Sequence, residues 1–165
     1  MNKVTQILND FLKTQGYAED EVRAEFIAEE DSYYDESPSV PLIVLGGMTN
    51  KTADEIFMRY CKEELGLNVD VDVITLSFLH ELGHHNTIDS LDDEEMEASE
   101  WTKFMLNIKD ESNQVFTEKD YMRYFTCPIE IEATMDAVVF CNDNPEVAKD
   151  LDTRIIQGLW EVLCE

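Results

Sequence analysis

The sequence predicts an α+β domain that is mostly helical, with a small sheet near its amino end. Three observations lead to this prediction: helical spacing of apolar residues over most of the chain, two short strand-like segments between residues 22 and 45, and Gly or Pro residues between the segments. The 165 residues have the length of one domain, and no repeat or long linker divides them. We therefore expect a single domain over residues 1–165.

The amino-terminal half combines helical and strand patterns. Apolar residues near the amino terminus follow helical spacing as far as Gly16, and the apolar run Val40–Leu45 stops at Gly46. Asn50 or Thr52 can cap the helix that follows. The expected elements are a helix over 3–15, a strand over 22–30, a polar turn over 31–39, a buried strand over 40–45 and a helix over 53–65.

The carboxyl-terminal half predicts helices only. Thr117 can cap a short helix. Pro128 and Pro145 each suit the first turn of a longer helix, because backbone N–H groups there have no partner within the helix and the missing N–H of proline costs nothing. The expected helices cover residues 71–85, 92–106, 117–125, 128–141 and 145–163.

Charge and cysteine content limit the possible partners and the compartment. Twelve basic residues face 37 acidic ones, for a formal net charge of −25. This field repels nucleic acids and acidic membranes, so we expect neither as a direct partner, and it favours cations and basic proteins. No segment has the length of a membrane span or the pattern of a secretory signal, which predicts a cytoplasmic protein. The four cysteines are widely spaced, so we expect them reduced and buried, without a cysteine-based zinc site.

One motif carries most of the chemical information. His80 and His84 are four positions apart, so on a helix both imidazoles project from one face and can hold one Zn²⁺ ion. Glu81 is placed beside the ion, where it can take a proton from a water molecule that the metal activates. The chain has only three histidines, all within six positions, and composition alone gives such a motif in about one sequence of this kind in a hundred. His85 points about 100° away from His84 on a helix, which indicates a structural or solvent-facing role.

A zinc site of this kind needs a third protein ligand, and we expect a carboxylate because no further histidine exists. The segment 127–140 is apolar and helical, so acids within it need a reason to be buried. Glu132 is our first choice for the ligand, with Glu130 ranked below it because it faces elsewhere on a helix. Asp136 shares a face with Glu132 and can accept a hydrogen bond from the non-ligating nitrogen of a zinc histidine.

These residues resemble a known family. His80-Glu81-Leu82-Gly83-His84, followed 48 positions later by Glu132 and Asp136, is similar to the gluzincin zinc peptidases. In thermolysin-like members, a helix with the pattern E-x-x-x-D follows the histidine motif, and the short chain is also similar to the minimal ImmA/IrrE-type zincins of bacteria and phages. The resemblance rests on about 20 residues and implies a zincin-like fold, a bound Zn²⁺ ion and peptidase activity.

The sequence therefore predicts a zinc metallopeptidase that uses a metal-activated water and Glu81 as general base. A tyrosine can stabilise the oxyanion, with Tyr121, Tyr124, Tyr33 and Tyr34 as candidates. The strand at 40–45 can bind an extended peptide by pairing along its edge, and the acidic surface favours a basic peptide or protein as the substrate. The alternative is a non-catalytic zinc-containing binding protein: a partner regulator, or a phage-encoded inhibitor whose negative field mimics DNA. An open metal position in a cleft favours the enzyme, whereas a filled cleft favours the binding protein.

Overall fold

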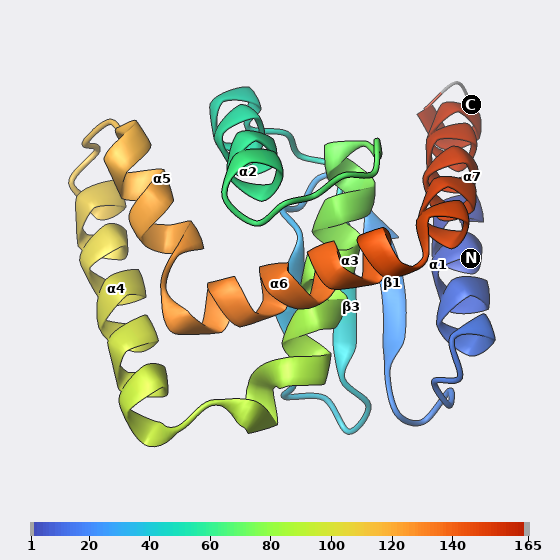
Figure 1. Ribbon diagram of the computed structural model, residues 1–165, viewed down its shortest axis with the longest axis horizontal. Coiled ribbons are helices and arrows are strands. Elements are labelled where there is room, and N and C mark those ends of the chain that lie inside the picture. Colours follow the sequence, from blue (N-terminus) through green and yellow to red (C-terminus); the bar gives the residue numbers. More distant parts are fainter. Residues whose placement is uncertain (1, 164–165) are drawn as a thin grey trace.

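The computed structural model describes residues 2–163 and confirms the predicted fold class: helices surround a small three-stranded sheet near the amino end (Figure 1). The helices are α1 (Lys3–Thr14), α2 (Lys51–Glu63), α3 (Val73–Thr87), α4 (Asp93–Glu111), α5 (Glu118–Phe125), α6 (Pro128–Asp143) and α7 (Pro145–Leu163), with a 3₁₀ turn at Ile88–Ser90. The strands are β1 (Arg23–Ile27), β2 (Tyr33–Asp35) and β3 (Leu42–Gly46).

Most predicted helix starts are found where capping chemistry indicated them. The Asn50 side chain accepts a hydrogen bond from the Ala53 amide and begins α2. Thr117 forms a reciprocal capping box with Asp120 at the start of α5. Pro128 occupies the first turn of α6, as expected. The polar turn predicted over 31–39 is wrong in part, because Tyr33–Asp35 within it form β2, a strand too short to produce a sequence pattern.

The strand order is β1-β3-β2, so β3 lies in the middle of the sheet. It pairs in parallel with β1, with Ala24 opposite Ile43, and antiparallel with β2, with Tyr34 also opposite Ile43. The edge role predicted for the strand at 40–45 is therefore wrong: both sides of β3 are already hydrogen-bonded, and a peptide has no free edge to join there. β1 and β2 are the edge strands.

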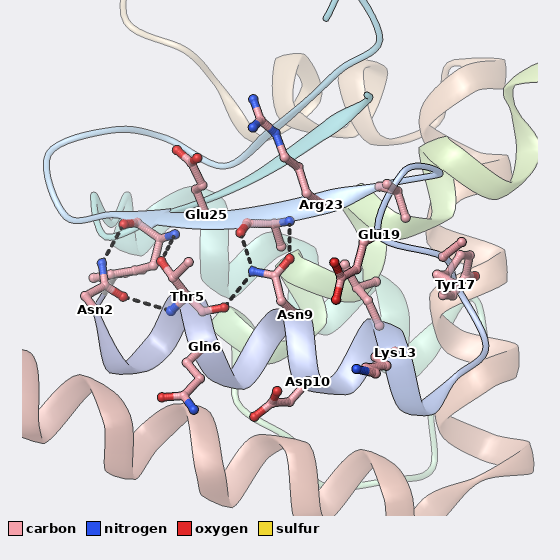
Figure 2. A pocket seen from close by; sticks show the side chains of 15 residues that line it. Asn2, Thr5, Gln6, Asn9, Asp10, Lys13, Tyr17, Glu19, Arg23 and Glu25 are labelled. Atoms are coloured by element: carbon pink, nitrogen blue, oxygen red, sulfur yellow. Dashed lines mark hydrogen bonds between the residues drawn. The ribbon is translucent and has the colours of Figure 1, made fainter. Parts of the chain in front are cut away.

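Side chains of α1 close the outer edge of β1 (Figure 2). The Asn9 side chain donates from Nδ2 to the Ala24 carbonyl at 2.7 Å and accepts from the Ala24 amide at 3.0 Å. Thr5 Oγ1 accepts from the Phe26 amide at 3.0 Å, and Asn2 Nδ2 donates to the Phe26 carbonyl at 3.0 Å. A cavity of about 720 Å³ lies along this junction. Because these side chains satisfy the outward-facing backbone groups of Ala24 and Phe26, the β1 edge is not available to another strand.

The core surrounds α3, which is buried on nearly all sides; its side chains Leu76 and Phe78 are fully buried. One continuous cluster of buried apolar side chains joins α1, the sheet, α2, α3, α6 and α7. Cys61, Cys127 and Cys141 are buried and free, while Cys164 lies outside the described residues. Over residues 2–163, none of the helices has both the length and the apolar character needed to cross a membrane.

The edge closure gives a first prediction. Asn9→Ala removes both hydrogen bonds to Ala24 and should lower the free energy of unfolding by about 1–3 kcal/mol, because two backbone groups lose their partner. The neighbouring Asp10→Ala, at an exposed position, should change it by less than about 0.5 kcal/mol. Urea denaturation followed by circular dichroism measures both. Equal effects of the two substitutions would contradict a specific role of Asn9.

Candidate metal centre

Helix α3 brings the three predicted residues together. His80, Glu81 and His84 are buried, at 7%, 8% and 7% exposure, and one ligand atom from each lies within 4.8 Å of the others. Asp72 caps the helix, its side chain accepting a hydrogen bond from the Ile74 amide. The two imidazole rings are 4.6 Å apart, consistent with their spacing of about one helical turn. The predicted grouping of the motif on one buried helix is confirmed.

Helix α6 crosses α3 at close range beside this motif (Figure 1). The closest approach is at Gly83, where an added Cβ would lie only 2.3 Å from the carbonyl oxygen of Ala133. Only glycine allows this separation. As a result, the residues on either side of Ala133 on the buried face of α6, Glu130 and Thr134, lie against the histidines.

Glu130 is the carboxylate that reaches the histidine pair. Its Oε2 atom lies 3.0 Å from His80 Nε2 and 3.5 Å from His84 Nε2. Its other oxygen, Oε1, lies 2.7 Å from Lys103 Nζ, which extends from α4. Glu130 has no exposed surface, so these three contacts provide the pairing that a buried carboxylate needs.

The structure does not bring Glu132, the predicted third ligand, to His80 and His84; Glu130 lies there instead. Glu132 is exposed, since two residues separate side chains by about 200° around a helix. A sequence signal for Glu130 exists: Ala133, Thr134, Ala137, Val138 and Cys141 define the buried face of α6, and the four-residue spacing from Val138 to Thr134, continued backwards, reaches Glu130.

The predicted role of Asp136 is also corrected. Asp136 accepts a hydrogen bond from Asn86 Nδ2 at 2.8 Å, and within the described residues it makes no hydrogen bond to His80 or His84. The Nδ1 atom of His80 lies 3.0 Å from the hydroxyl of Thr134, which donates to the Glu130 carbonyl at 2.7 Å. Thr134 thus fixes the His80 ring, one turn after Glu130. Within residues 2–163, His84 Nδ1 has no hydrogen-bond partner.

His85 is separate from the pair, in agreement with the predicted structural role. Its Nδ1 atom lies 3.2 Å from the hydroxyl of Tyr34, and its Nε2 atom lies 3.9 Å from a carboxylate oxygen of Glu21. These contacts connect the carboxyl-terminal part of α3 to β2 and to the loop before β1.

The ionisable groups of the cluster strongly influence one another. Burial alone would raise the pKa of Glu130, but hydrogen bonds and charges from His80 and His84 hold the pKa well below its usual range. Burial lowers the pKa of His80, yet the hydrogen bond to Glu130 and the charges of Glu81 and Glu130 outweigh it and raise the pKa. Burial raises the pKa of Glu81, and the two histidines offset this only in part. The raised pKa of His80 favours a proton that balances the charge of Glu130, a role that a divalent cation can take over with release of that proton.

A pocket of about 200 Å³ opens beside the cluster. Glu81, His84 and Glu130 line it, together with two residues from other helices, Lys103 and Tyr124. The remaining lining residues include Ser32, Tyr33, Tyr34 and Glu36, from β2 and its flanks. Sequence reasoning had named Tyr124 among four tyrosines and missed Lys103, whose only signal is that basic residues are scarce in this chain.

The ligand atoms fit a metal ion. Ligands bound at about 2.0–2.1 Å around a tetrahedral Zn²⁺ ion lie about 3.3–3.4 Å from one another. The observed distances from Glu130 Oε2 to the two Nε2 atoms, 3.0 and 3.5 Å, are close to this separation. Glu81 Oε2 is farther out, 4.0 Å from His84 Nε2, as expected for a base that does not coordinate the ion. Two imidazoles and a carboxylate form a donor set that Zn²⁺ favours.

Comparisons with protein-family models, with curated proteins and with solved structures found no match to this chain. The gluzincin resemblance of the sequence motif stays a prediction. The chemistry of the candidate metal centre is therefore the basis for a functional proposal.

The ligand assignment can be tested with two variants. Glu130→Gln should weaken zinc binding by more than about tenfold, because even the loss of an outer hydrogen-bonding partner costs about 10–100-fold in affinity. Glu132→Gln should leave zinc affinity unchanged, because that side chain is exposed. Competition with a chromogenic chelator measures both affinities. Zinc loss in Glu132→Gln with retention in Glu130→Gln would reverse the assignment.

The close helix crossing gives a further prediction. Gly83→Ala should push α6 away from α3, with a loss of about 1–3 kcal/mol in stability and weaker zinc binding, because the new Cβ meets backbone atoms. The control is Gly158→Ala in α7, whose Cβ would meet side-chain atoms and no backbone: Ile7 Cδ1 at 2.9 Å and Val4 Cγ2 at 3.3 Å are the nearest. There the better helix propensity of alanine, about 1 kcal/mol, offsets the contact. Thermal unfolding and zinc titration of both variants check this, and normal zinc affinity in Gly83→Ala would exclude a role of the crossing in the site.

Proposed function

We propose that the chain is a zinc-dependent metallopeptidase in which His80, His84 and Glu130 hold the ion and Glu81 is the general base. One observation carries this proposal: two histidine nitrogens converge on one oxygen of a fully buried carboxylate, beside a second carboxylate that lines a pocket. When bound, Zn²⁺ lowers the pKa of a water ligand and polarises a carbonyl group. The proposal extends to the gluzincin resemblance, with Glu130 in the position of the carboxylate ligand.

Glu81 is suited to proton transfer. It is anchored on the same helix turn as the histidines, and its carboxylate lies 4.0 Å from His84 Nε2 at the pocket wall. Its raised pKa makes it a stronger base than an exposed glutamate, so it can take a proton from the attacking water and return it to the leaving amine. The ring of Phe57 packs against His80 from the other side, 5.7 Å away, and helps to exclude water from that side of the cluster.

Tyr124 is the tyrosine best placed to stabilise an oxyanion. Burial and the charges of Glu130 and Glu81 hold the pKa of Tyr124 well above its usual value, so its hydroxyl remains a hydrogen-bond donor. The Tyr124 hydroxyl is within reach of Glu130, whose hydrogen bond also raises the pKa. The hydroxyls of two other candidates contact side chains outside the cluster: Tyr33 donates to Glu30 at 3.1 Å, and Tyr34 contacts His85. Tyr121 is not part of this pocket lining and lies beside Asn50, which donates to its hydroxyl at 3.2 Å.

The outer edge of β2 supports binding of an extended substrate. β2 is an edge strand, and its residues Tyr33 and Tyr34 line the same pocket as Glu81. A peptide that pairs with this edge would run past the candidate metal centre. The net charge of −25 favours a basic peptide or protein as the substrate. Three buried free cysteines are consistent with the proposed cytoplasmic location, where thiols stay reduced.

The rival proposal, a non-catalytic zinc protein whose acidic surface binds a regulator partner or mimics DNA, calls for a filled cleft or a fourth protein ligand. The pocket beside Glu81 and His84 favours the enzyme instead, because it leaves room next to the three proposed ligands.

The catalytic role of Glu81 is testable. Zinc-loaded protein should cleave peptides in a fluorescence-quenched library, and Glu81→Gln should reduce kcat by about 10²–10⁴-fold while zinc content stays near one ion per chain. The matched control is Glu36→Gln, which alters an exposed carboxylate of the same pocket and should keep activity. Full activity of Glu81→Gln would exclude this mechanism. Zinc binding without any cleavage by the unaltered protein would favour the non-catalytic rival.

A further inference from the structure

Helix α4 carries an apolar face that points away from the protein. Trp101, Phe104, Met105 and Ile108 are 63%, 54%, 48% and 43% exposed. They occupy positions i, i+3, i+4 and i+7, so they form one stripe, which we call the outer face of α4. The rings of Trp101 and Phe104 are 5.8 Å apart, which makes the stripe continuous at one end.

The outer face of α4 is not explained by the fold. Only Ser99 and Leu106 of this 19-residue helix are buried, and they lie on the opposite side, toward α5 and α6. In Figure 1, α4 lies at the periphery, away from the sheet. Of the eleven large apolar residues that are exposed in residues 2–163, five fall between Trp101 and Val115, which is a cluster and not the usual scatter.

The stripe also forms one wall of a groove. Trp101, Met105 and Ile108 line a depression of about 770 Å³, with Thr126 and Pro128 among the residues of its lining from the α5–α6 junction. A hollow bounded by an apolar helix face is the shape that accepts an amphipathic helix in known complexes.

The charges of α4 around the stripe are mainly negative. Glu94 and Glu97 precede Trp101 by seven and four positions, so they continue the outer face toward the amino end of α4, and Glu111 borders its other end. Helix α4 contains seven acids and two bases, and both bases are engaged by acids elsewhere: Lys103 by Glu130 and Lys109 by Asp120. Of the charges left to meet a partner, those on α4 are acidic, while one exposed base, Arg123 of α5, lines the groove.

From the exposed stripe, the groove and the flanking acids, we propose that the outer face of α4 is a docking surface for a basic amphipathic helix of another protein. The apolar residues of the partner helix would cover the stripe, and the lysines or arginines of that helix would contact Glu94, Glu97 and Glu111. A second copy of this chain is a poor occupant, because each copy carries a net charge of −25 and presents the same acids. This surface lies outside the candidate metal centre, so the docking does not depend on the proposed peptidase activity.

The test uses a fluorescein-labelled 18-residue helical peptide with a leucine stripe flanked by lysines, at about 0.15 M salt, where distant charges are screened. Two controls are a scrambled peptide of identical composition and a peptide with glutamates in place of the lysines. Fluorescence anisotropy should show saturable binding of the first peptide, at least about tenfold tighter than either control. Equal binding of the scrambled peptide would reduce the interaction to non-specific charge attraction and overturn the proposal.

Protein variants locate the binding surface. The double substitution Trp101→Ser and Phe104→Ser should weaken peptide binding by at least about tenfold. Trp160→Ser, at an exposed tryptophan of α7, should leave the affinity unchanged. Ile108→Lys is a second, independent variant and should also weaken binding, and circular dichroism checks that each protein is folded. Unchanged affinity in both α4 variants would overturn the proposal. So would a dimer, detected by light scattering, that the α4 variants dissolve, because the stripe would then be a self-association interface.

Discussion

The crossing of α3 and α6 at Gly83 is the constraint on which the candidate site depends. Two helices that carry ordinary side chains at their contact have axes about 8–10 Å apart. A glycine facing the Ala133 carbonyl lets the backbones approach more closely. This approach lets short side chains act across the interface: the Thr134 hydroxyl reaches His80 Nδ1, and Glu130 reaches both Nε2 atoms. Gly83, within the H-E-L-G-H motif, thus determines how closely α6 approaches His80 and His84, the first and last residues of that motif.

The same crossing buries charge, and burial of charge needs compensation. An unpaired carboxylate in the interior costs several kcal/mol, so Glu130 is stable only because His80, His84 and Lys103 surround it. An apolar side chain of similar size would fill the position at no such cost, as replacements of buried ion pairs in other proteins indicate. A core that keeps two histidines, two glutamates and a lysine in contact is therefore better explained by function than by stability. The nitrogen and oxygen donors in the cluster are of the kinds that bind divalent cations, which is the function that we propose for it.

The sequence was informative where local chemistry decides the outcome. Caps at Asn50 and Thr117, and the proline that opens α6, marked helix starts correctly, because each depends on a few neighbouring atoms. Sequence reasoning failed where helical phase mattered: Glu130 and Glu132 differ by two positions, and the choice between them depends on which face of α6 meets α3. It also failed for β2 and for Lys103, whose placement depends on β3 and on Glu130, partners distant in the sequence.

The two edges of the sheet differ in how their backbone groups are covered, and this difference bears on the proposed function. An exposed strand edge invites pairing with other chains, and folded proteins commonly cover it. Here Asn2, Thr5 and Asn9 satisfy the backbone of β1 with side-chain groups, which leaves no donor or acceptor pattern for a second strand. The β2 edge is short and lies beside the pocket that contains Glu81. Because three polar side chains block the β1 edge, the edge that remains is the one whose residues Tyr33 and Tyr34 line the pocket of Glu81, His84 and Glu130, and this is the edge that the proposed extended substrate would use.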